Sequence, residues 1–183
     1  MMKHGHLLRA SRPLLALIGL MTAAAAQAER LDIDHRLYAP LHAAMEQPHE
    51  GSVFYQASPS GRQFDRILVN GTSAEHDWTE ALELVVAPRK GERKTPQEWF
   101  AAFQAASEST CPANVTVLGE DESSITFSLE APPCSTGTPL SGLYRVIYGR
   151  KTVYVVSAKL KGQMRADQRQ QWLGLLNSAK LAG

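Results

Sequence analysis

Histidine and aspartate side chains near the start of the chain are the first groups that could do chemistry, as metal ligands. Four histidines lie beyond residue 28, and two aspartates precede the first of them: His35, His42, His49, His76, Asp32 and Asp34. A seven-residue spacing puts His35 and His42 on one face of a helix, whereas zinc ligands on a helix usually lie three to five residues apart. We therefore expect solvated polar side chains on a surface helix, and neither a metal nor another cofactor.

Serine and cysteine side chains are the candidate nucleophiles. Ser60 and Ser141 each precede a glycine in a turn-like segment, and neither lies in the G-x-S-x-G pattern of serine hydrolases. The sequence also has no H-E-x-x-H motif, phosphate-binding loop or dinucleotide-binding glycine pattern. Cys111 and Cys134 remain, and pairing with each other would silence both. The sequence therefore favours a protein that is not an enzyme.

A segment rich in tyrosine and arginine near the C-terminus is the candidate binding surface. It contains Tyr144, Tyr148, Arg150 and Tyr154. Tyrosine and arginine are enriched in interface cores because both present wide contact area with hydrogen-bonding tips. If the tyrosines share a solvent-facing side of a hairpin, they can hold a protein partner; if they face a helix, they belong to the core. The alternation of residues leaves both possibilities open, because two adjacent apolar residues make both faces of the strand apolar.

The first 28 residues have the organisation of a secretory signal peptide. Three basic residues precede an apolar run of 13 residues, Leu14 to Ala26, and Ala26-Gln27-Ala28 provides small residues at a cleavage site. The run is shorter than the roughly 20 residues that a membrane-spanning helix needs. No cysteine lies near the cleavage site, so a lipid cannot be attached to a new N-terminal cysteine. We expect cleavage after Ala28 and export to a bacterial periplasm or to the medium, without an integral membrane anchor.

The exported part, residues 29–183, is long enough for one domain with a hydrophobic core. Loss of residues 1–28 removes three basic residues and no acid, which changes the formal net charge from +1 to −2. A nearly neutral chain without a block of like charge gives no electrostatic reason to expect nucleic acid or an anionic membrane surface as a partner.

The two cysteines are expected to form a structural disulfide. Cys111 and Cys134 both lie in the exported part, and paired thiols are usual in an oxidising compartment. The closed loop spans 24 residues and stabilises the fold by about 3.4 kcal/mol if the effect is chain entropy. A redox or metal role is disfavoured, because redox cysteines generally form Cys-x-x-Cys and a metal needs further ligands nearby.

The periodicity of apolar residues predicts an α+β fold, an antiparallel sheet covered by two or three helices and braced by one disulfide. Residues 29–49 are expected to be helical or irregular, and a hairpin follows at 53–55 and 64–69. The later elements are expected at these residues: strand 81–86, helix 96–106, hairpin 115–129, hairpin 143–158 and helix 165–181. Thr95, Pro96 and Glu98 form the start signal of the first long helix. We expect one core between sheet and helices, made by Leu84, Trp99, Phe103, Phe127, Leu129 and Trp172.

The order of these elements from Trp78 to the C-terminus resembles the Mog1/PsbP-like superfamily, which includes small exported bacterial proteins. The resemblance rests on element order and on the tyrosine-rich hairpin. It implies an α+β domain, to which the disulfide would be an addition. Since members differ in function and most are binding or accessory proteins, it implies no particular activity.

The sequence therefore predicts a non-enzymatic periplasmic protein that binds another protein or a component of the envelope. The alternative is a periplasmic immunity or inhibitor protein that neutralises a secreted toxin or hydrolase. Small size, export, one disulfide and the lack of a catalytic motif suit both functions.

Overall fold

A seven-stranded antiparallel sheet forms the centre of the computed structural model, which describes residues 29–89, 95–110, 112–133 and 140–182. Across the sheet the strands follow the order β2 (Val53–Ala57), β3 (Gln63–Gly71), β4 (Trp78–Pro88), β8 (Thr152–Lys161), β7 (Leu140–Tyr148), β6 (Ser124–Ala131) and β5 (Asn114–Glu120). Both predicted later hairpins, β5–β6 and β7–β8, are present. The predicted α+β class is confirmed, while the disulfide between Cys111 and Cys134 lies outside the described residues.

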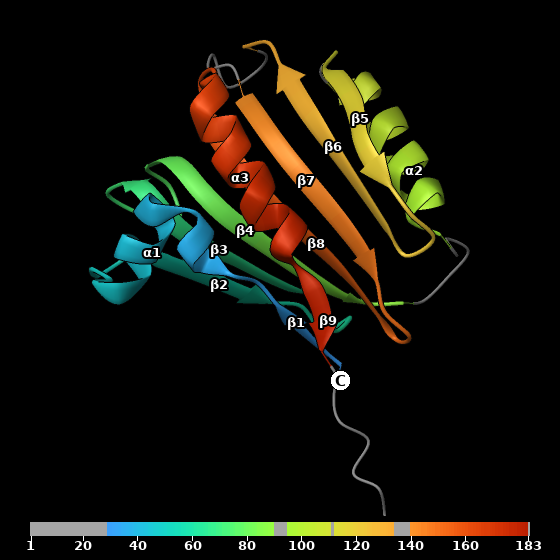
Figure 1. Cartoon of the computed structure of the whole chain (residues 1–183), viewed down its shortest axis with the longest axis horizontal. Coiled ribbons are helices and arrows are strands. Elements are labelled where there is room, and N and C mark those ends of the chain that lie inside the picture. The colour runs from blue at the N-terminus through green and yellow to red at the C-terminus, as the bar shows by residue number, and fades with distance from the viewer. Residues whose placement is uncertain (1–28, 90–94, 111, 134–139, 183) are drawn as a thin grey trace, which may run out of the picture.

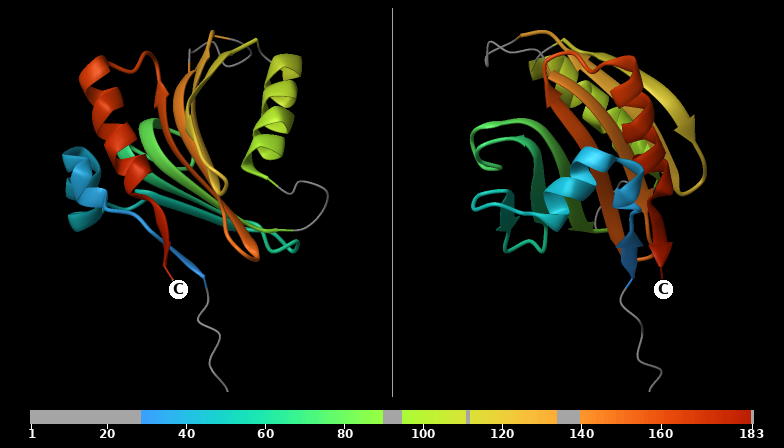
Figure 2. Two further views of the ribbon diagram at one scale, coloured as in Figure 1. Left: turned by 45° about the vertical axis from the view of Figure 1, so that its right-hand side comes forward. Right: turned by 60° about the vertical axis from the view of Figure 1, so that its left-hand side comes forward.

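Three α-helices cover the two faces of this sheet unequally. Helices α1 (Ala39–Glu46) and α3 (Ala166–Ser178) lie on one face, and α2 (Pro96–Thr110) lies on the other (Figures 1 and 2). Helix α2 begins at the predicted capping box, in which the Glu98 N–H donates to Thr95 Oγ1 and the Thr95 N–H donates to the Glu98 carboxylate. None of the helices in the described part of the chain is long and apolar enough to cross a membrane.

The expectation of a single core is wrong, because successive residues of each strand point to opposite faces and both faces are covered. Trp172 of α3 packs on the first face with Leu84. Trp99 and Phe103 of α2 pack on the second face with the β6 side chains Phe127 and Leu129. The six predicted residues thus divide between two cores that the sheet separates.

Helix α3 also buries a row of hydroxyl side chains on β6, which alternate with apolar residues along the strand. Ser124, Thr126 and Ser128 are all buried. Ser128 is the register partner of Leu143, which belongs to the core under α3. The hydroxyl side chains of β6 are therefore buried although they are polar, because helix α3 lies over this face of the strand.

A buried carboxylate joins α3 to the sheet and to the N-terminal segment. Glu80 Oε1 of β4 accepts hydrogen bonds from Trp172 Nε1 at 2.8 Å, Gln168 Nε2 at 2.7 Å and the Tyr38 hydroxyl at 2.5 Å. Burial and the bond to Glu80 raise the pKa of Tyr38 to about 12. Tyr38 lies between the short 3-10 helix η1 (His35–Leu37) and α1, so this cluster positions the whole N-terminal segment.

The two ends of the described chain pair as a small second sheet that the sequence did not predict. Strand β1 (Arg30–Asp32) is antiparallel to β9 (Lys180–Ala182), with Leu31 opposite Leu181. Figure 1 shows the two strands side by side below the main sheet. Each strand has only three residues, too few to show an alternating pattern.

Candidate functional site: a cleft between helix α2 and the sheet

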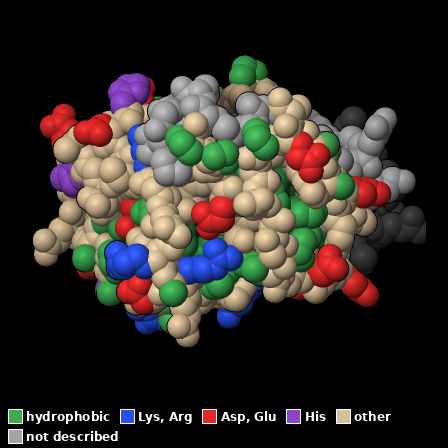
Figure 3. Space-filling model, turned by 90° about the horizontal axis from the view of Figure 1, so that it is seen from above, with side chains coloured by type: hydrophobic (Ala, Val, Ile, Leu, Met, Phe, Trp, Pro, Cys, Tyr) green, Lys and Arg blue, Asp and Glu red, His purple; other side chains and the backbone are tan. Residues whose placement is uncertain are grey.

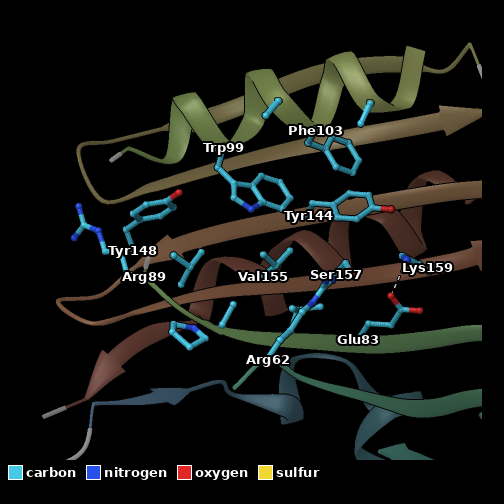
Figure 4. A pocket seen from close by; sticks show the side chains of 16 residues that line it. Arg62, Glu83, Arg89, Trp99, Phe103, Tyr144, Tyr148, Val155, Ser157 and Lys159 are labelled. Atoms are coloured by element: carbon cyan, nitrogen blue, oxygen red, sulfur yellow. Dashed lines mark ion pairs between the residues drawn. The ribbon is translucent and has the colours of Figure 1, made fainter. Parts of the chain in front are cut away.

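Helix α2 covers only part of its face of the sheet, and a cleft of about 510 Å³ opens beside it. The helix packs on β6 and β7, whereas β2, β3 and much of β4 lie beyond its reach. Side chains from β4, β8, β7 and α2 line the cleft (Figure 4). A volume of this size falls within the range of small-molecule sites, about 300–1,000 Å³.

The register of four strands places a row of functional side chains along the cleft. Glu83 of β4 is the partner of Ser157 on β8, Ser157 is the partner of Tyr144 on β7, and Tyr144 is the partner of Phe127 on β6. Cross-strand partners share a face and have Cβ atoms about 5 Å apart. The row therefore runs from a charged end at Glu83 to an aromatic end at Phe127.

At the charged end, one buried carboxylate lies between two cations. The Glu83 side chain is 3% exposed, and its oxygens lie 2.8 Å from Arg66 Nη2 and 2.6 Å from Lys159 Nζ. Burial lowers the pKa of Lys159, but the neighbouring Tyr144 and Glu83 raise it by more, so the pKa lies above its ordinary value. Lys159 is therefore charged at neutral pH, and the three groups neutralise one another in part.

Three polar groups in the cleft have hydrogen-bonding capacity that no described residue uses. They are the guanidinium of Arg62, the hydroxyl of Ser157 and the hydroxyl of Tyr144. Figure 4 shows Arg62 extending from the edge of the cleft toward Ser157. Burial raises the pKa of Tyr144, so its phenol is protonated at neutral pH. These groups meet where the apolar part of the cleft begins.

The ring of Tyr144 owes its position to a glycine two residues earlier. It stacks on Phe127 with a centroid distance of 5.0 Å and an interplanar angle of 5°. A Cβ atom at Gly142 would lie 2.6 Å from Tyr144 Cε2, so any larger residue would push the ring away. Gly142 thus makes room for the tyrosine that forms one wall of the cleft.

The middle of the cleft is apolar. Val85, Val153 and Val155 form its floor on β4 and β8, and Trp99 and Phe103 of α2 face them. The two aromatic rings stack at 5.5 Å with an interplanar angle of 10°. A ligand in this position would contact mainly hydrocarbon.

Tyr148 and Arg89 close the far end of the cleft. The Arg89 guanidinium lies 5.1 Å from the centroid of the Tyr148 ring, and its Nη1 donates to the Gly149 carbonyl at 3.0 Å. A cation over an aromatic face holds both side chains in place. Figure 4 shows this pair at the opposite end from Lys159 and Glu83.

The structure separates the residues of the predicted binding surface. Tyr144 and Tyr148 are buried side chains that line the cleft. Tyr154 belongs to the core under α3, and its hydroxyl donates to the Glu29 carbonyl at 2.8 Å. Arg150 is exposed in the turn after β7, where its backbone N–H donates to Glu29 Oε1. The four residues do not form one surface, because Tyr154 points to the opposite face of the sheet.

Two of the histidines meet, although not on a single helix. His35 Nδ1 in η1 lies 3.2 Å from His42 Nδ1 in α1. Within the described ranges, no group of three or more His, Cys, Asp or Glu side chains is arranged to hold a metal ion. The absence of a metal or another cofactor stays a prediction.

Sequence reasoning missed the residues that make the cleft polar, namely Arg62, Glu83, Ser157 and Lys159. A signal was present, because Glu83, Ser157 and Lys159 interrupt otherwise apolar strands. What the sequence does not contain is the register that places Glu83 beside Lys159 and Ser157 beside Tyr144. In the view of Figure 3, basic side chains gather in the left half of the face, together with acidic ones, and the charged side chains in the right half are acidic.

No protein-family model and no curated protein matches this chain. Among solved structures, the chain is similar to cyanobacterial PsbP (CyanoP) from Synechocystis sp. PCC 6803, with 15% sequence identity and a TM-score of 0.38. The match covers 74% of this chain and 96% of that chain. Membership of the Mog1/PsbP-like superfamily stays a prediction. No functional argument rests on a likeness of this size.

Proposed function

We propose that the protein is an exported, non-enzymatic binding protein that holds a component of the cell envelope in the cleft beside α2. The observation that carries this proposal is the set of polar groups whose side chains have no hydrogen-bond partner among the described residues, Arg62, Ser157 and Tyr144, in an otherwise apolar cleft. A mainly apolar pocket with a few convergent polar groups is the usual form of a ligand site. The site lies on the central strands of a sheet, which hold it rigidly.

The arrangement around Ser157 favours binding over catalysis. A serine nucleophile needs a base within hydrogen-bond reach. The oxygens of the carboxylate on the neighbouring strand, Glu83, are already engaged by Arg66 and Lys159. Lys159 is itself protonated, so it cannot serve as a base either. Among the described residues that line the cleft, no other carboxylate or histidine is present.

A variant that fills the cleft tests the proposal. Ala102 of α2 lines the cleft, whereas Ala101 on the same helix is exposed, so Ala102→Phe and Ala101→Phe form a matched pair. Native mass spectrometry of protein recovered gently from the producing cell should show a bound small molecule with the wild type and with Ala101→Phe. The same signal should be lost with Ala102→Phe. A wild type that carries no additional mass, or an adduct that survives in Ala102→Phe, would contradict the proposal.

Export is part of the same proposal and has its own test. Residues 1–28 have the organisation of a secretory signal peptide, with the predicted cleavage site after Ala28. The intact mass of protein from the periplasm or the medium should correspond to a chain that starts at Glu29. A full-length chain retained in the membrane fraction would show that residues 1–28 act as an anchor.

The alternative function, an immunity or inhibitor protein, would use an exposed surface instead of a cleft. The edge strand β5 is the surface that favours it, because Val117 and Leu118 are 43% and 40% exposed there. Under this alternative, Ala102→Phe leaves partner binding intact and a charge introduced by Val117→Glu abolishes it. The opposite result favours the cleft.

A further inference from the structure

The cleft carries more positive than negative charge. Three cations line it, Arg62, Arg89 and Lys159, against the single carboxylate of Glu83. That carboxylate is matched by Lys159 and also by Arg66 just outside the cleft. Arg62 forms no ion pair with any described residue. The charge that the cleft leaves for a ligand to neutralise is therefore positive, and it lies at Arg62.

The groups around Arg62 suit the oxygen atoms of a small anion. A guanidinium offers parallel N–H donors that match the two oxygens of a carboxylate. The hydroxyls of Ser157 and Tyr144, which are register partners on adjacent strands, can each donate one more hydrogen bond. Together they form a donor set at the point where the row of polar groups meets the apolar floor.

The apolar floor has the dimensions of a medium-length alkyl chain. From Ser157 to Val153 the strand β8 advances four residues, which is about 13 Å at about 3.3 Å per residue. Val155 and Val153 point into the cleft along this path, and Trp99 faces them from α2. A single extended hydrocarbon chain would bury its surface here, and such burial is the main source of affinity in apolar sites.

We propose that the ligand is a single-chain amphipathic anion, with its acidic head group at Arg62, Ser157 and Tyr144 and its hydrocarbon chain along the valines of β8. This assignment rests on the proposed binding function and names the class of envelope component. The positive charge of Arg62 favours such an anion over a neutral or cationic amphiphile. A carboxylate is the simplest head group of this class and serves as the probe.

Three probes with one chain length and different head groups test the assignment: decanoate, 1-decanol and decyltrimethylammonium, each below its micelle concentration. Binding to the full exported protein is measured by isothermal titration calorimetry and by the change in tryptophan fluorescence, to which Trp99 contributes from the wall of the cleft. Decanoate should bind at least about tenfold more tightly than decanol, because a hydrogen bond to a charged group is worth that much or more. The cation should bind more weakly than the alcohol.

Two variants connect the preference to one residue. Arg62→Gln should reduce the affinity for decanoate to that for decanol and leave decanol binding unchanged. Arg36→Gln, which changes an arginine on the other side of the molecule that pairs with Asp34, should alter neither. Equal binding of all three probes, abolished by Ala102→Phe, would overturn the anionic class and leave the binding function standing. Failure of decanoate to bind would also overturn this assignment, while the native mass measurement decides the binding function separately.

Discussion

Replacing Glu83 with glutamine removes the one negative charge that Arg66 and Lys159 share in the interior. The carboxylate is 3% exposed, and the two cationic side chains are 16% and 23% exposed, so the three groups are largely withdrawn from water. Breaking a buried ion pair from one side typically costs 3–5 kcal/mol. Both cations keep some contact with solvent, and Arg66 also donates to the Ala74 carbonyl. We therefore expect a loss near the lower limit, about 3 kcal/mol.

The assay is urea unfolding followed by far-UV circular dichroism, with thermal unfolding alongside. A loss of about 3 kcal/mol should lower Tm by about 6–12 °C for a chain of this length. Arg165→Gln, which breaks the exposed pair with Asp167, is the control and should change stability by less than about 0.5 kcal/mol. The double variant Glu83→Gln/Lys159→Met should recover part of the loss, because it removes a cation left without its partner. A loss below about 0.5 kcal/mol in Glu83→Gln would refute the buried ion cluster.

The pH dependence of the same variant supplies an independent check. The pKa of Lys159 is raised in the folded protein, so its contribution to stability is complete below the unfolded value of about 10.4 and is lost as the pH rises through the folded value. Burial lowers the pKa of Lys159 and Glu83 raises it. Without Glu83 the folded pKa is raised less, so this alkaline loss should shrink. Tyr38, whose pKa is about 12, also destabilises the fold in this range, but equally in both proteins. Burial and Glu83 raise the pKa of Tyr144 as well, so loss of Glu83 changes its alkaline effect in the same direction as that of Lys159. The measured quantity is therefore the difference between wild type and variant from pH 9 to 12, and identical curves would contradict the reasoning.

Two further predictions concern a glycine and the cysteines. Gly142→Ala should lower the free energy of unfolding by about 1–3 kcal/mol, because the new methyl group displaces the Tyr144 ring. Urea unfolding measures this loss. The control Gly119→Ala, whose methyl group meets nothing within 4 Å, should be nearly neutral. Cys111 and Cys134 should be bonded if the protein is exported, since paired thiols are usual in an oxidising compartment. Alkylation without reductant followed by mass spectrometry should find no free thiol, and labelling of both cysteines would disprove the bond.

Much of the fold could be predicted from local patterns. The strand β6 alternates in polarity, β7 and β8 are rich in β-branched and aromatic residues, and each hairpin has a short turn. Helix α2 begins with a capping box, so residues close in sequence determine these elements. Strands β1 and β9 escaped prediction because each is too short for periodicity and pairs with a segment about 150 residues away. The burial of the hydroxyl side chains of β6 could not be predicted from their alternation for a related reason, since helix α3, which covers them, is distant in sequence.

The candidate site divides in the same way. The sequence alone indicated Tyr144, Tyr148, Arg150 and Tyr154 as residues that could hold a protein partner, because such side chains combine contact area with a polar tip. It also predicted the helix and strands that carry them. Only the tertiary structure decided that Tyr144 and Tyr148 line a cleft, that Tyr154 belongs to the opposite core, and that Arg62 and Ser157 line the same cleft. The physical reason is that side-chain type and alternation are local properties, whereas a site depends on strand register and on which face each helix covers. Those are set by packing between segments far apart in the chain.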